Sequence, residues 1–197
     1  NIILLSLVSL VVTSCGLFDS GSPLDPTLIP VKSGEKYGFI GTDGKIEINP
    51  QFEYAYFFTE EKMALVMQNK KYGFISKEGQ MVIQPVYITA NSFSEELACV
   101  VPENGKPQFI NTKNEVIIPG LDVDYCSSFQ DGLALIGKVD DKDKRLFGFI
   151  DKKGSIVIPA TFAEALAFSE GRAAVRKDTK GSEEGTWGYI DQKGTLV

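Results

Sequence analysis

Apolar and polar residues alternate along most of this chain in short runs, which is the period of a half-buried β-strand. In residues 71–75, Tyr72 and Phe74 fall on one face of such a strand, because successive side chains point to opposite faces. A polar break at 76–79 is followed by a second apolar run at 80–83. The pattern therefore predicts two short strands that are joined by a tight turn.

The same pattern recurs at regular intervals. A motif of aromatic, Gly, aromatic and Ile begins at positions 37, 72, 147 and 187, and a degraded copy, Pro-Gln-Phe-Ile, begins at position 107. The steps between these positions are 35, 35, 40 and 40 residues. Self-similarity at a nearly fixed period indicates a tandem repeat. The candidate structural residues of the motif are Tyr37, Gly38, Phe39, Tyr72, Gly73, Phe74, Phe147, Gly148, Phe149, Trp187, Gly188 and Tyr189.

Each unit continues in the same way after its motif. The turn ends on a glycine in four units and on Asn114 in the third, and both residue types tolerate the positive φ of a three-residue hairpin loop. The second strand is expected to end at a proline, because proline cannot donate a hydrogen bond to a neighbouring strand. A less regular stretch follows, and then a third strand built around an alanine, a role that residues 28–31 are expected to fill in the first unit. The turn glycines are Gly44, Gly79, Gly154 and Gly194, the prolines are Pro50, Pro85, Pro119 and Pro159, and the alanines are Ala64, Ala98, Ala134 and Ala173.

These units predict an all-β fold, a solenoid-like tandem array of three-stranded antiparallel meanders. The alternative is a β-propeller, although propeller blades usually take about 40–45 residues and four strands. The motif glycine and the strand alanine are expected to let a neighbouring backbone or ring approach closely. The recurring aromatic residues are expected to form a continuous interior spine from unit to unit, and their alternative role is a surface on which sugars stack.

The first segment of the chain indicates export. Residues 1–12 are almost wholly apolar, too short to cross a bilayer, and of the right length for the apolar part of a secretion signal. Residues 12–15, Val-Thr-Ser-Cys, are similar to a bacterial lipobox. This resemblance implies a lipid on Cys15, which would hold the protein at a membrane. An ordinary cleaved signal with an incidental cysteine is the alternative.

The expected domain organisation has three parts. Residues 1–14 are a lipoprotein signal peptide whose true start is missing, and residues 15–30 are the lipidated Cys15 and a flexible tether rich in Gly, Ser, Asp and Pro. Residues 31–197 are the repeat domain of about five units, the last of them incomplete. Gly16 stands where inner-membrane lipoproteins often carry Asp, so the expected location is the cell envelope, at the outer membrane if the cell has one.

Composition removes several classes of function. The chain has no histidine, so catalysis and metal binding by histidine are excluded. Its net charge is −6 and no basic stripe appears, which argues against nucleic acid as a partner. No cofactor or metal site is expected. Cys99 and Cys126 could form a disulfide in an exported protein, but the favoured interpretation is two separate small buried side chains.

The whole pattern has a counterpart in a known family. Aromatic-Gly-aromatic-Ile-Asp, a Lys/Gly turn, Val-Ile-Pro and Phe-Ser-Glu-Gly-x-Ala-x-Val together resemble the bacterial WG-repeat (KWG-repeat) family, with the best copy at residues 147–175. The resemblance covers residues 37–197, although only Trp187 keeps the family's tryptophan and Gln108 replaces the glycine of the third unit. It implies a protein that is often exported or lipid-anchored and has no defined enzymatic activity.

Length variation between units is concentrated in one loop, which follows the alanine strand. The distance from the alanine to the next motif glycine grows from 9 residues (64 to 73) to 15 residues (173 to 188). Insertions on one edge of a repeat array often mark a binding face. A calcium site at residues 140–143 would lack the glycine and terminal Glu of an EF-hand loop, so a solvated charged loop is favoured. The candidate binding-edge residues are Asp140, Asp141, Asp143, Lys177, Asp178 and Glu183.

Three functions can be ranked from these observations. The leading expectation is a lipid-anchored envelope protein that binds an unidentified protein or glycan through its repeat surface, without catalysis. The alternative is a carbohydrate- or peptidoglycan-binding module. A hydrolase with paired carboxylates is the least favoured, because Glu60, Glu95 and Glu170 are expected to share one repeat position and are typical of turns.

Overall fold

The structure, a computed structural model, describes residues 24–140, 143–177 and 185–197. These residues form strands β1 to β18 and no helix, and the strands pair antiparallel throughout. The all-β array of antiparallel meanders that the sequence predicts is therefore confirmed.

The strands group into five successive units. The first unit contains β2 (Leu28–Ser33), β3 (Lys36–Gly41) and β4 (Ile46–Phe52), preceded by the short β1 (Leu24–Asp25). The second contains β5 (Tyr54–Thr59), β6 (Met63–Gln68), β7 (Lys71–Ser76) and β8 (Met81–Ala90). The third contains the end of β8 with β9 (Ala98–Pro102), β10 (Gln108–Ile110) and β11 (Val116–Ile118). The fourth contains β12 (Tyr125–Gln130), β13 (Leu133–Val139), β14 (Arg145–Asp151) and β15 (Ile156–Phe162), and the fifth contains β16 (Glu164–Ala165), β17 (Ala173–Lys177) and β18 (Thr186–Ile190).

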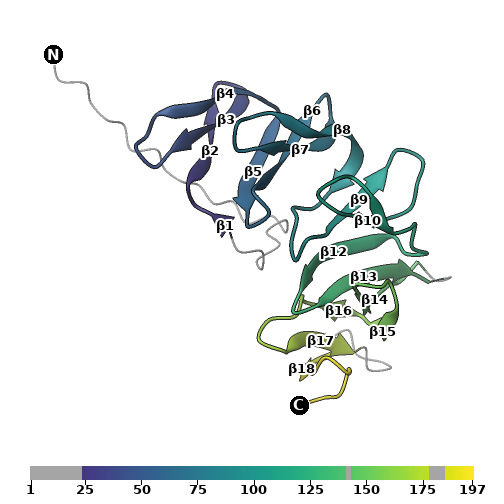
Figure 1. The fold of residues 1–197 in the computed structure, drawn as a ribbon. Coiled ribbons are helices and arrows are strands. Elements are labelled where there is room, and N and C mark those ends of the chain that lie inside the picture. The colour runs from purple at the N-terminus through teal and green to yellow at the C-terminus, as the bar shows by residue number, and fades with distance from the viewer. Residues whose placement is uncertain (1–23, 141–142, 178–184) are drawn as a thin grey trace.

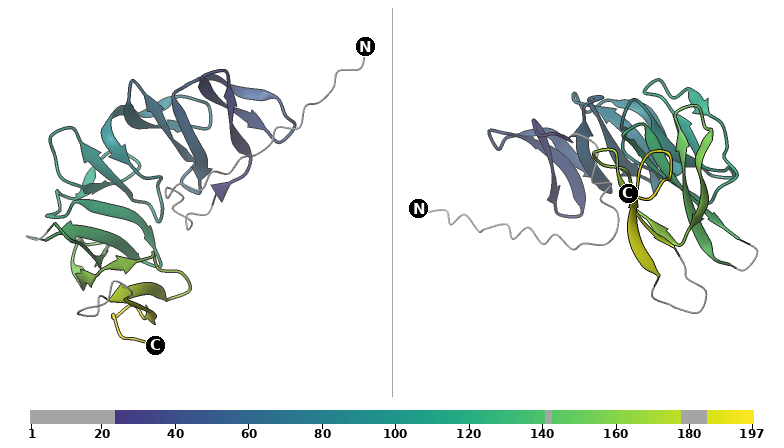
Figure 2. Two further views of the ribbon diagram at one scale, coloured as in Figure 1. Left: turned by 180° about the vertical axis from the view of Figure 1, so that it is seen from behind. Right: turned by 90° about the horizontal axis from the view of Figure 1, so that it is seen from below.

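The units follow one another along an arc, from β2–β4 at one end to β16–β18 at the other (Figures 1 and 2). The second and third units share one eight-stranded sheet, because the first part of β8 pairs with β7 and its last part with β9. The fourth unit forms a separate sheet in the order β12-β13-β14-β15. The stretch after each proline was expected to be less regular, but it forms β5, β12, β16 and the end of β8, which gives a unit up to four strands.

The motif glycine is required by a close approach of backbone. A Cβ atom at Gly73 would lie 2.6 Å from the carbonyl oxygen of Ile83 and 2.8 Å from the nitrogen of Pro85. Gly38 and Gly148 face the equivalent backbone atoms in their own units. These contacts confirm the close approach that the sequence predicts and leave no room for a side chain.

The expected strand end at each proline is wrong in three units. β4, β8 and β15 run through Pro50, Pro85 and Pro159, whereas β11 ends just before Pro119. In the three continuous strands, the register shifts opposite the motif glycine; Phe74 pairs with Ile83, but Tyr72 pairs with Tyr87. The proline therefore sits in a bulge, where its missing N–H costs no hydrogen bond.

The predicted turn geometry is confirmed in all five turns. Gly44, Gly79, Gly154 and Gly194 have φ values of 78°, 77°, 81° and 81°, and Asn114 has a φ of 65°. Each of these residues donates its N–H to the carbonyl three residues earlier, as Gly79 does to Ser76 at 2.9 Å. The turns also pack on the preceding unit, since a Cβ at Gly79 would lie 3.2 Å from Ile48. In the third unit, Asn114 instead accepts a hydrogen bond of 2.6 Å from the hydroxyl of Tyr87.

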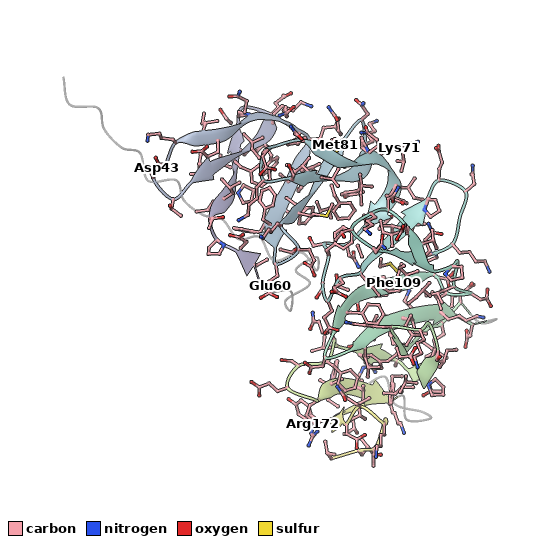
Figure 3. All side chains as sticks on the ribbon, viewed as in Figure 1. Asp43, Glu60, Lys71, Met81, Phe109 and Arg172 are labelled. Atoms are coloured by element: carbon pink, nitrogen blue, oxygen red, sulfur yellow. A yellow bond between two sulfur atoms is a disulfide. The ribbon has the colours of Figure 1, made fainter. Side chains whose placement is uncertain are left out.

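The hydrophobic cores lie between successive units. Phe74 packs in one core with Ile83 and Phe93, while the next residue, Ile75, packs in the preceding core with Phe39. A sheet inside the array is therefore buried on both faces. Four aromatic pairs lie in these cores, with ring centroids 5.1, 4.7, 4.8 and 4.8 Å apart: Phe39–Phe58, Phe74–Phe93, Phe109–Phe129 and Phe149–Phe168. Figure 3 places Phe109 within the body of the molecule. The rings form separate pairs, one in each core, where a continuous spine was expected.

The folded body begins earlier than the sequence predicts. Residues up to 30 were assigned to the tether, but β1 pairs with β5, and Leu28 is buried in the first core. The ammonium of Lys77 pairs with Asp25 and donates to the hydroxyl of Thr27 at 2.9 Å. Residues 28–33 pair with β3 in the register of the alanine strand, as expected for the first unit. The expected signal peptide and Cys15 lie outside the described residues.

Candidate functional site

A groove of about 1050 Å³ opens on the third and fourth units. It follows β12, from Tyr125 at one end to Gln130 at the other. One side is formed by the end of β8 and by the loop before β10, and another by residues 165–169 of the fifth unit. Its exposed apolar side chains are Ile88, Tyr125 and Leu166, with exposed fractions of 47%, 40% and 59%. The groove is therefore built from three consecutive units.

The groove lies where the repeat departs from its pattern. The third unit has Gln108 in place of the motif glycine. A side chain at this position leaves no room for the close approach of the following strand that occurs at Gly73. β11 accordingly ends at Ile118, and only the Leu121 N–H continues the contact, with the Pro107 carbonyl at 2.8 Å. Residues 122–124, which follow the early end of β11, line the groove together with residues 105–107. Loss of one glycine thus coincides with the opening of the site.

An aspartate between two lysines lies at one end of the groove. Asp122 accepts hydrogen bonds from the ammonium groups of Lys106 and Lys138, at 2.6 and 2.5 Å. These two bonds, that of Lys106 first, lower the pKa of Asp122 to about 2. All three side chains are more than half exposed. Nearby, Asp124 accepts the N–H of Val139 at 2.7 Å. The Asp122 carboxylate and the two ammonium groups are therefore accessible to solvent at this end of the groove.

A disulfide joins the third and fourth units beside the groove. Cys99 of β9 and Cys126 of β12 are bonded, with their Cα atoms 6.2 Å apart. Both residues are buried, as expected, but the favoured interpretation of two separate side chains is wrong. The sequence could not place them together because they come from different repeat positions. The bond links two sheets that share no strand pairing.

The free edge of β12 is held by side chains of the third unit. The Asn91 amide donates to the Cys126 carbonyl at 3.0 Å, and the Ser94 hydroxyl donates to the Phe129 carbonyl at 2.7 Å. In return, the Ser128 hydroxyl donates to the Ser92 carbonyl at 3.0 Å. These bonds occupy backbone groups that an added strand would need. The edge of β12 is therefore joined to the third unit by side-chain hydrogen bonds.

A smaller hollow of about 580 Å³ lies over acidic turns, and its carboxylates are structural. Glu61 accepts the N–H of Glu96 at 3.0 Å, Glu95 accepts that of Gly132 at 3.1 Å, and Asp131 accepts that of Gly171 at 2.7 Å. Each bond joins a turn to the next unit. Figure 3 shows this side of the molecule at Glu60 and Arg172, on the inner side of the arc. The equivalent of Glu95 is Glu61, and Glu60, which was expected at that position, is its neighbour.

The variable loops contribute less to the site than the sequence suggested. Asp140 accepts the Lys144 N–H at 3.0 Å and Asp143 donates its N–H to the Asp140 carbonyl, so this end of the loop is a local turn. The ammonium of Lys177 lies 5.6 Å from the centre of the Phe162 ring. The described residues of these two loops, at 140, 143–144 and 177, do not line the groove, whereas the variable loop of the third unit contributes Gly105 and Lys106 to it. The other candidates, Asp141, Asp178 and Glu183, lie outside the described residues.

The second aromatic residue of the motif is interior in the first four units, as the sequence predicts, whereas the first one is half-buried at Tyr37, Tyr72 and Phe147. Phe39, Phe74, Phe109 and Phe149 are fully buried. Trp187 and Tyr189 are exceptions, with exposed fractions of 47% and 60%, because no further sheet covers the outer face of β18 among the described residues. Tyr37 and Tyr54 stack with ring centroids 5.3 Å apart, and Tyr54 and Tyr56 lie 6.2 Å apart. Among the described residues, no motif residue or binding-edge candidate named from the sequence lines the groove, although Cys99 and Cys126 do. The degraded motif at Pro107 and Gln108 and the variable loop before it, at residues 101–106, were the sequence signals that could have located it.

The geometry defines an all-β repeat protein whose irregular unit carries a groove. Residues 37–72, 72–106, 109–142 and 147–180 each match the family model described as WG containing repeat. These matches span more than half of the chain, so the chain belongs to this family. The departures at Gln108 and in the tryptophan position are variations within it.

Other comparisons add little. No curated protein matches the chain. Among solved structures, it is similar to the crystal structure of the N-terminal domain of Nup159, with a TM-score of 0.47 and 9% sequence identity. That similarity covers 89% of this chain and 59% of the other, so the chain spans less than two thirds of that protein's length.

Two structural features are absent from the described residues. These residues include no helix with the length and apolar character that a membrane crossing demands. Within the same ranges, no three acidic or cysteine side chains gather in an arrangement that could hold a metal ion.

Proposed function

We propose that this protein is an exported, lipid-anchored binding protein without catalytic activity, and that its groove holds part of another macromolecule. The observation that carries the proposal is the groove itself. It opens in the unit that has lost the motif glycine, and it exposes Ile88, Tyr125 and Leu166 together. Most binding sites combine such apolar walls with a few polar groups.

Two features support the cellular location. The Cys99–Cys126 bond is typical of oxidising compartments, because thiols stay reduced in the cytosol. The lipobox-like residues 12–15 support an anchor on Cys15, and the folded body begins near residue 24. A short tether would keep the groove near the membrane surface. Replacement of Cys15 by Ser is expected to abolish labelling by an alkyne fatty acid and to release the protein from the membrane fraction.

The acidic turns support a role without catalysis. Paired-carboxylate hydrolysis needs two acids at a defined separation around a substrate. Glu61, Glu95 and Asp131 instead accept backbone N–H groups of the next unit. The oxygen atoms of these carboxylates therefore already accept the hydrogen bonds that join the units.

Photo-crosslinking in cells tests the groove. A photoreactive amino acid at Leu166, inside the groove, is expected to give a discrete adduct with a macromolecule of the envelope. The matched control is Ile156, which is similarly exposed, at 65%, but does not line the groove. Equal adducts from both positions, or none from Leu166, Ile88 and Tyr125, would count against the groove as the binding site.

A glycan-binding function is the second candidate, and one observation favours it. Trp187 and Tyr189 are exposed together on one face of β18, as a sugar-stacking surface requires. Soluble peptidoglycan strands are then expected to shift the fluorescence of Trp187, the only tryptophan of the chain. An unchanged spectrum, together with equal retention of the Trp187→Ala variant on insoluble peptidoglycan, would remove this candidate.

A further inference from the structure

We infer that Asn104 is a site of spontaneous deamidation, in which the backbone nitrogen of Gly105 attacks the side-chain amide of Asn104. These two residues lie in the variable loop between β9 and β10, next to residues 105–107 of the groove wall. The reaction needs only this loop and water, so it is independent of the proposed binding function.

The reaction is a ring closure followed by hydrolysis, and its attacking and attacked groups belong to one chain. The Gly105 nitrogen bonds to Cγ of Asn104, the side-chain nitrogen leaves as ammonia, and the proton of Gly105 passes through water to that ammonia. Water then opens the succinimide ring and returns a proton to the Gly105 nitrogen. Cleavage of the bond to Cγ gives an aspartate, whereas cleavage of the bond to the main-chain carbonyl gives an isoaspartate.

Gly105 is well suited to the attack. It has no Cβ to shield its own nitrogen, and it leaves the backbone free to rotate toward the amide. Residues 103–106 are exposed, and the Gly105 N–H donates to the Pro102 carbonyl at 3.1 Å. Exposed turns of this kind open locally at low free energy. The nitrogen is therefore released to attack without unfolding of the sheet.

The Asn104 amide is also free to move into reach. It is exposed and, within the part of the chain that the structure describes, it makes no hydrogen bond. Three other asparagines have side-chain amides that are engaged, at positions 91, 111 and 114, with Cys126, Glu115 and Tyr87 as partners. A held amide cannot rotate toward the following nitrogen, so these sites are protected.

The remaining two asparagines of the described chain lack a suitable nitrogen. Asn69 is followed by Lys70, whose N–H donates to the Glu53 carboxylate at 3.0 Å. Asn49 is followed by Pro50, which has no N–H to lose. A free amide and an unshielded nitrogen thus coincide at Asn104.

Deamidation changes the loop beside the groove in two ways. Either product replaces a neutral amide by a carboxylate two residues before Lys106, which lines the groove and donates to Asp122 at 2.6 Å. Isoaspartate also adds a methylene to the main chain, because the chain then runs through the former side chain. A modified copy of the protein therefore carries one more negative charge in this loop.

Peptide mapping by mass spectrometry tests the reaction on the purified full chain, incubated in water enriched in heavy oxygen. The label marks hydrolysis during the incubation and not during the later digestion. We expect it in the peptide containing Asn104, as both aspartate and isoaspartate, at a rate that rises with pH because the Gly105 nitrogen must lose its proton. Asn104→Gln is expected to lose the reaction, because the longer side chain must close a larger ring. This variant is preferable to Gly105→Ala, whose Cβ would lie 2.3 Å from Pro102.

The same incubation in guanidinium chloride separates the effect of the fold from that of the sequence. The peptide containing Asn91 is expected to take up label only when the chain is unfolded, whereas the peptide containing Asn104 takes it up in both states. Labelling of Asn104 only in the unfolded chain would show that the turn protects it and would overturn the inference. Equal labelling of Asn91 and Asn104 in the folded chain would also overturn it. A product that contains aspartate alone, with an unchanged yield in Asn104→Gln, would exclude attack by Gly105.

Discussion

At the motif glycine of the first, second and fourth units, a hydrogen atom in place of a side chain lets two strands pass closely. At Gly73 the neighbouring strand passes with its backbone where a Cβ would be, and the bulge at Pro85 follows from this contact. Because the atoms involved are backbone, they cannot rotate away as a side chain would. The motif glycine is therefore required because it leaves room for the neighbouring backbone, while the turn glycines are required because their φ is positive.

We predict that Gly73→Ala destabilises the protein by about 1–3 kcal/mol, the usual range for inserting an atom into a packed site. The strand containing Ile83 and Pro85 must shift to make room. Urea unfolding of the purified variant measures the loss. Gly120→Ala is the control, because its Cβ would meet only Lys106, at an ordinary 3.5 Å. Similar losses in the two variants would show that the close approach at Gly73 is unimportant.

A second prediction at this scale concerns Tyr56. Burial, followed by the neighbouring Tyr72, raises the pKa of Tyr56 to about 12 from the ordinary 10.0. Between these values the unfolded chain loses the proton and the folded chain keeps it, so stability falls as the pH rises from 10 to 12. Below pH 10 this group has no effect on stability. Absorbance titration of tyrosinate and unfolding at each pH measure both quantities. In Tyr56→Phe the fall is expected to be smaller, and an identical fall would contradict the assignment.

The sequence predicted residues with local roles well. Asn114 in place of a turn glycine was expected to adopt positive φ, and it does. The choice of Asn over Gly also serves a contact that the sequence could not reveal, since its partner Tyr87 lies in another unit. Local conformation can be inferred from residue type, whereas contacts between units require the register of the strands.

At the scale of elements, the prediction and the structure differ at β8 and β12. The proline-bounded pattern predicted an irregular connection after each second strand, but β8 continues without a break from one unit into the next. The bulge at Pro85 lets the strand turn without losing its partners. No such shared strand links the third and fourth units, and side-chain bonds and a disulfide join them instead.

We predict that the double variant Cys99→Ala/Cys126→Ala is less stable than the oxidised protein by about 3–4 kcal/mol. The bond closes a loop of 27 residues, and the estimate follows from the chain entropy that this closure removes from the unfolded state. Thermal unfolding with and without a thiol reductant provides the measurement. The reductant should lower the melting temperature of the natural chain and leave that of the double variant unchanged. An equal response of both proteins to the reductant would show that the bond does not stabilise the fold.

The site itself could not be predicted because its walls are distant in the sequence. Asp122 meets Lys106 and Lys138 only after β11 has ended early, and that ending depends on the backbone contact missing at Gln108. Sequence reasoning treated Gln108 as drift within the repeat. A departure from the motif was in fact the best available indication of the groove.

At the scale of the whole molecule, a row of carboxylates connects the units. Each one lies in a turn and accepts an N–H from the equivalent turn of the following unit, as Glu95 does from Gly132. Glu170 occupies the same position in the last unit, where no following turn is described. Figure 3 labels Glu60 and Arg172, which lie in two of these turns, on the inner side of the arc. Coupling between neighbours of this kind makes stability a sum of unit and interface contributions.

We predict that Glu95→Ala costs about 1.5–3 kcal/mol more than Glu170→Ala, the usual range for a hydrogen bond to a charged group. The two glutamates form a matched pair, since both have positive φ, 51° and 53°, and alanine is equally strained at either position. Glu95 also pairs with Lys152 at 3.0 Å, and this contact is lost with it. Chemical unfolding of the two variants compares them directly. Equal costs would mean that the carboxylate row contributes nothing to the joining of the units.

The burial of inner sheets on both faces has an evolutionary consequence. One face of each inner sheet offers a motif phenylalanine and the other offers an alanine, a β-branched residue and an isoleucine, so the junctions between units are chemically alike. A gene segment that encodes one whole unit could therefore be duplicated or excised, and the sheets on either side of the change would still find compatible neighbours. The third unit is the exception, because the Cys99–Cys126 bond and the contacts of Asp122 with Lys106 and Lys138 bind it to its own neighbour. A lineage that lost this unit would lose the groove with it.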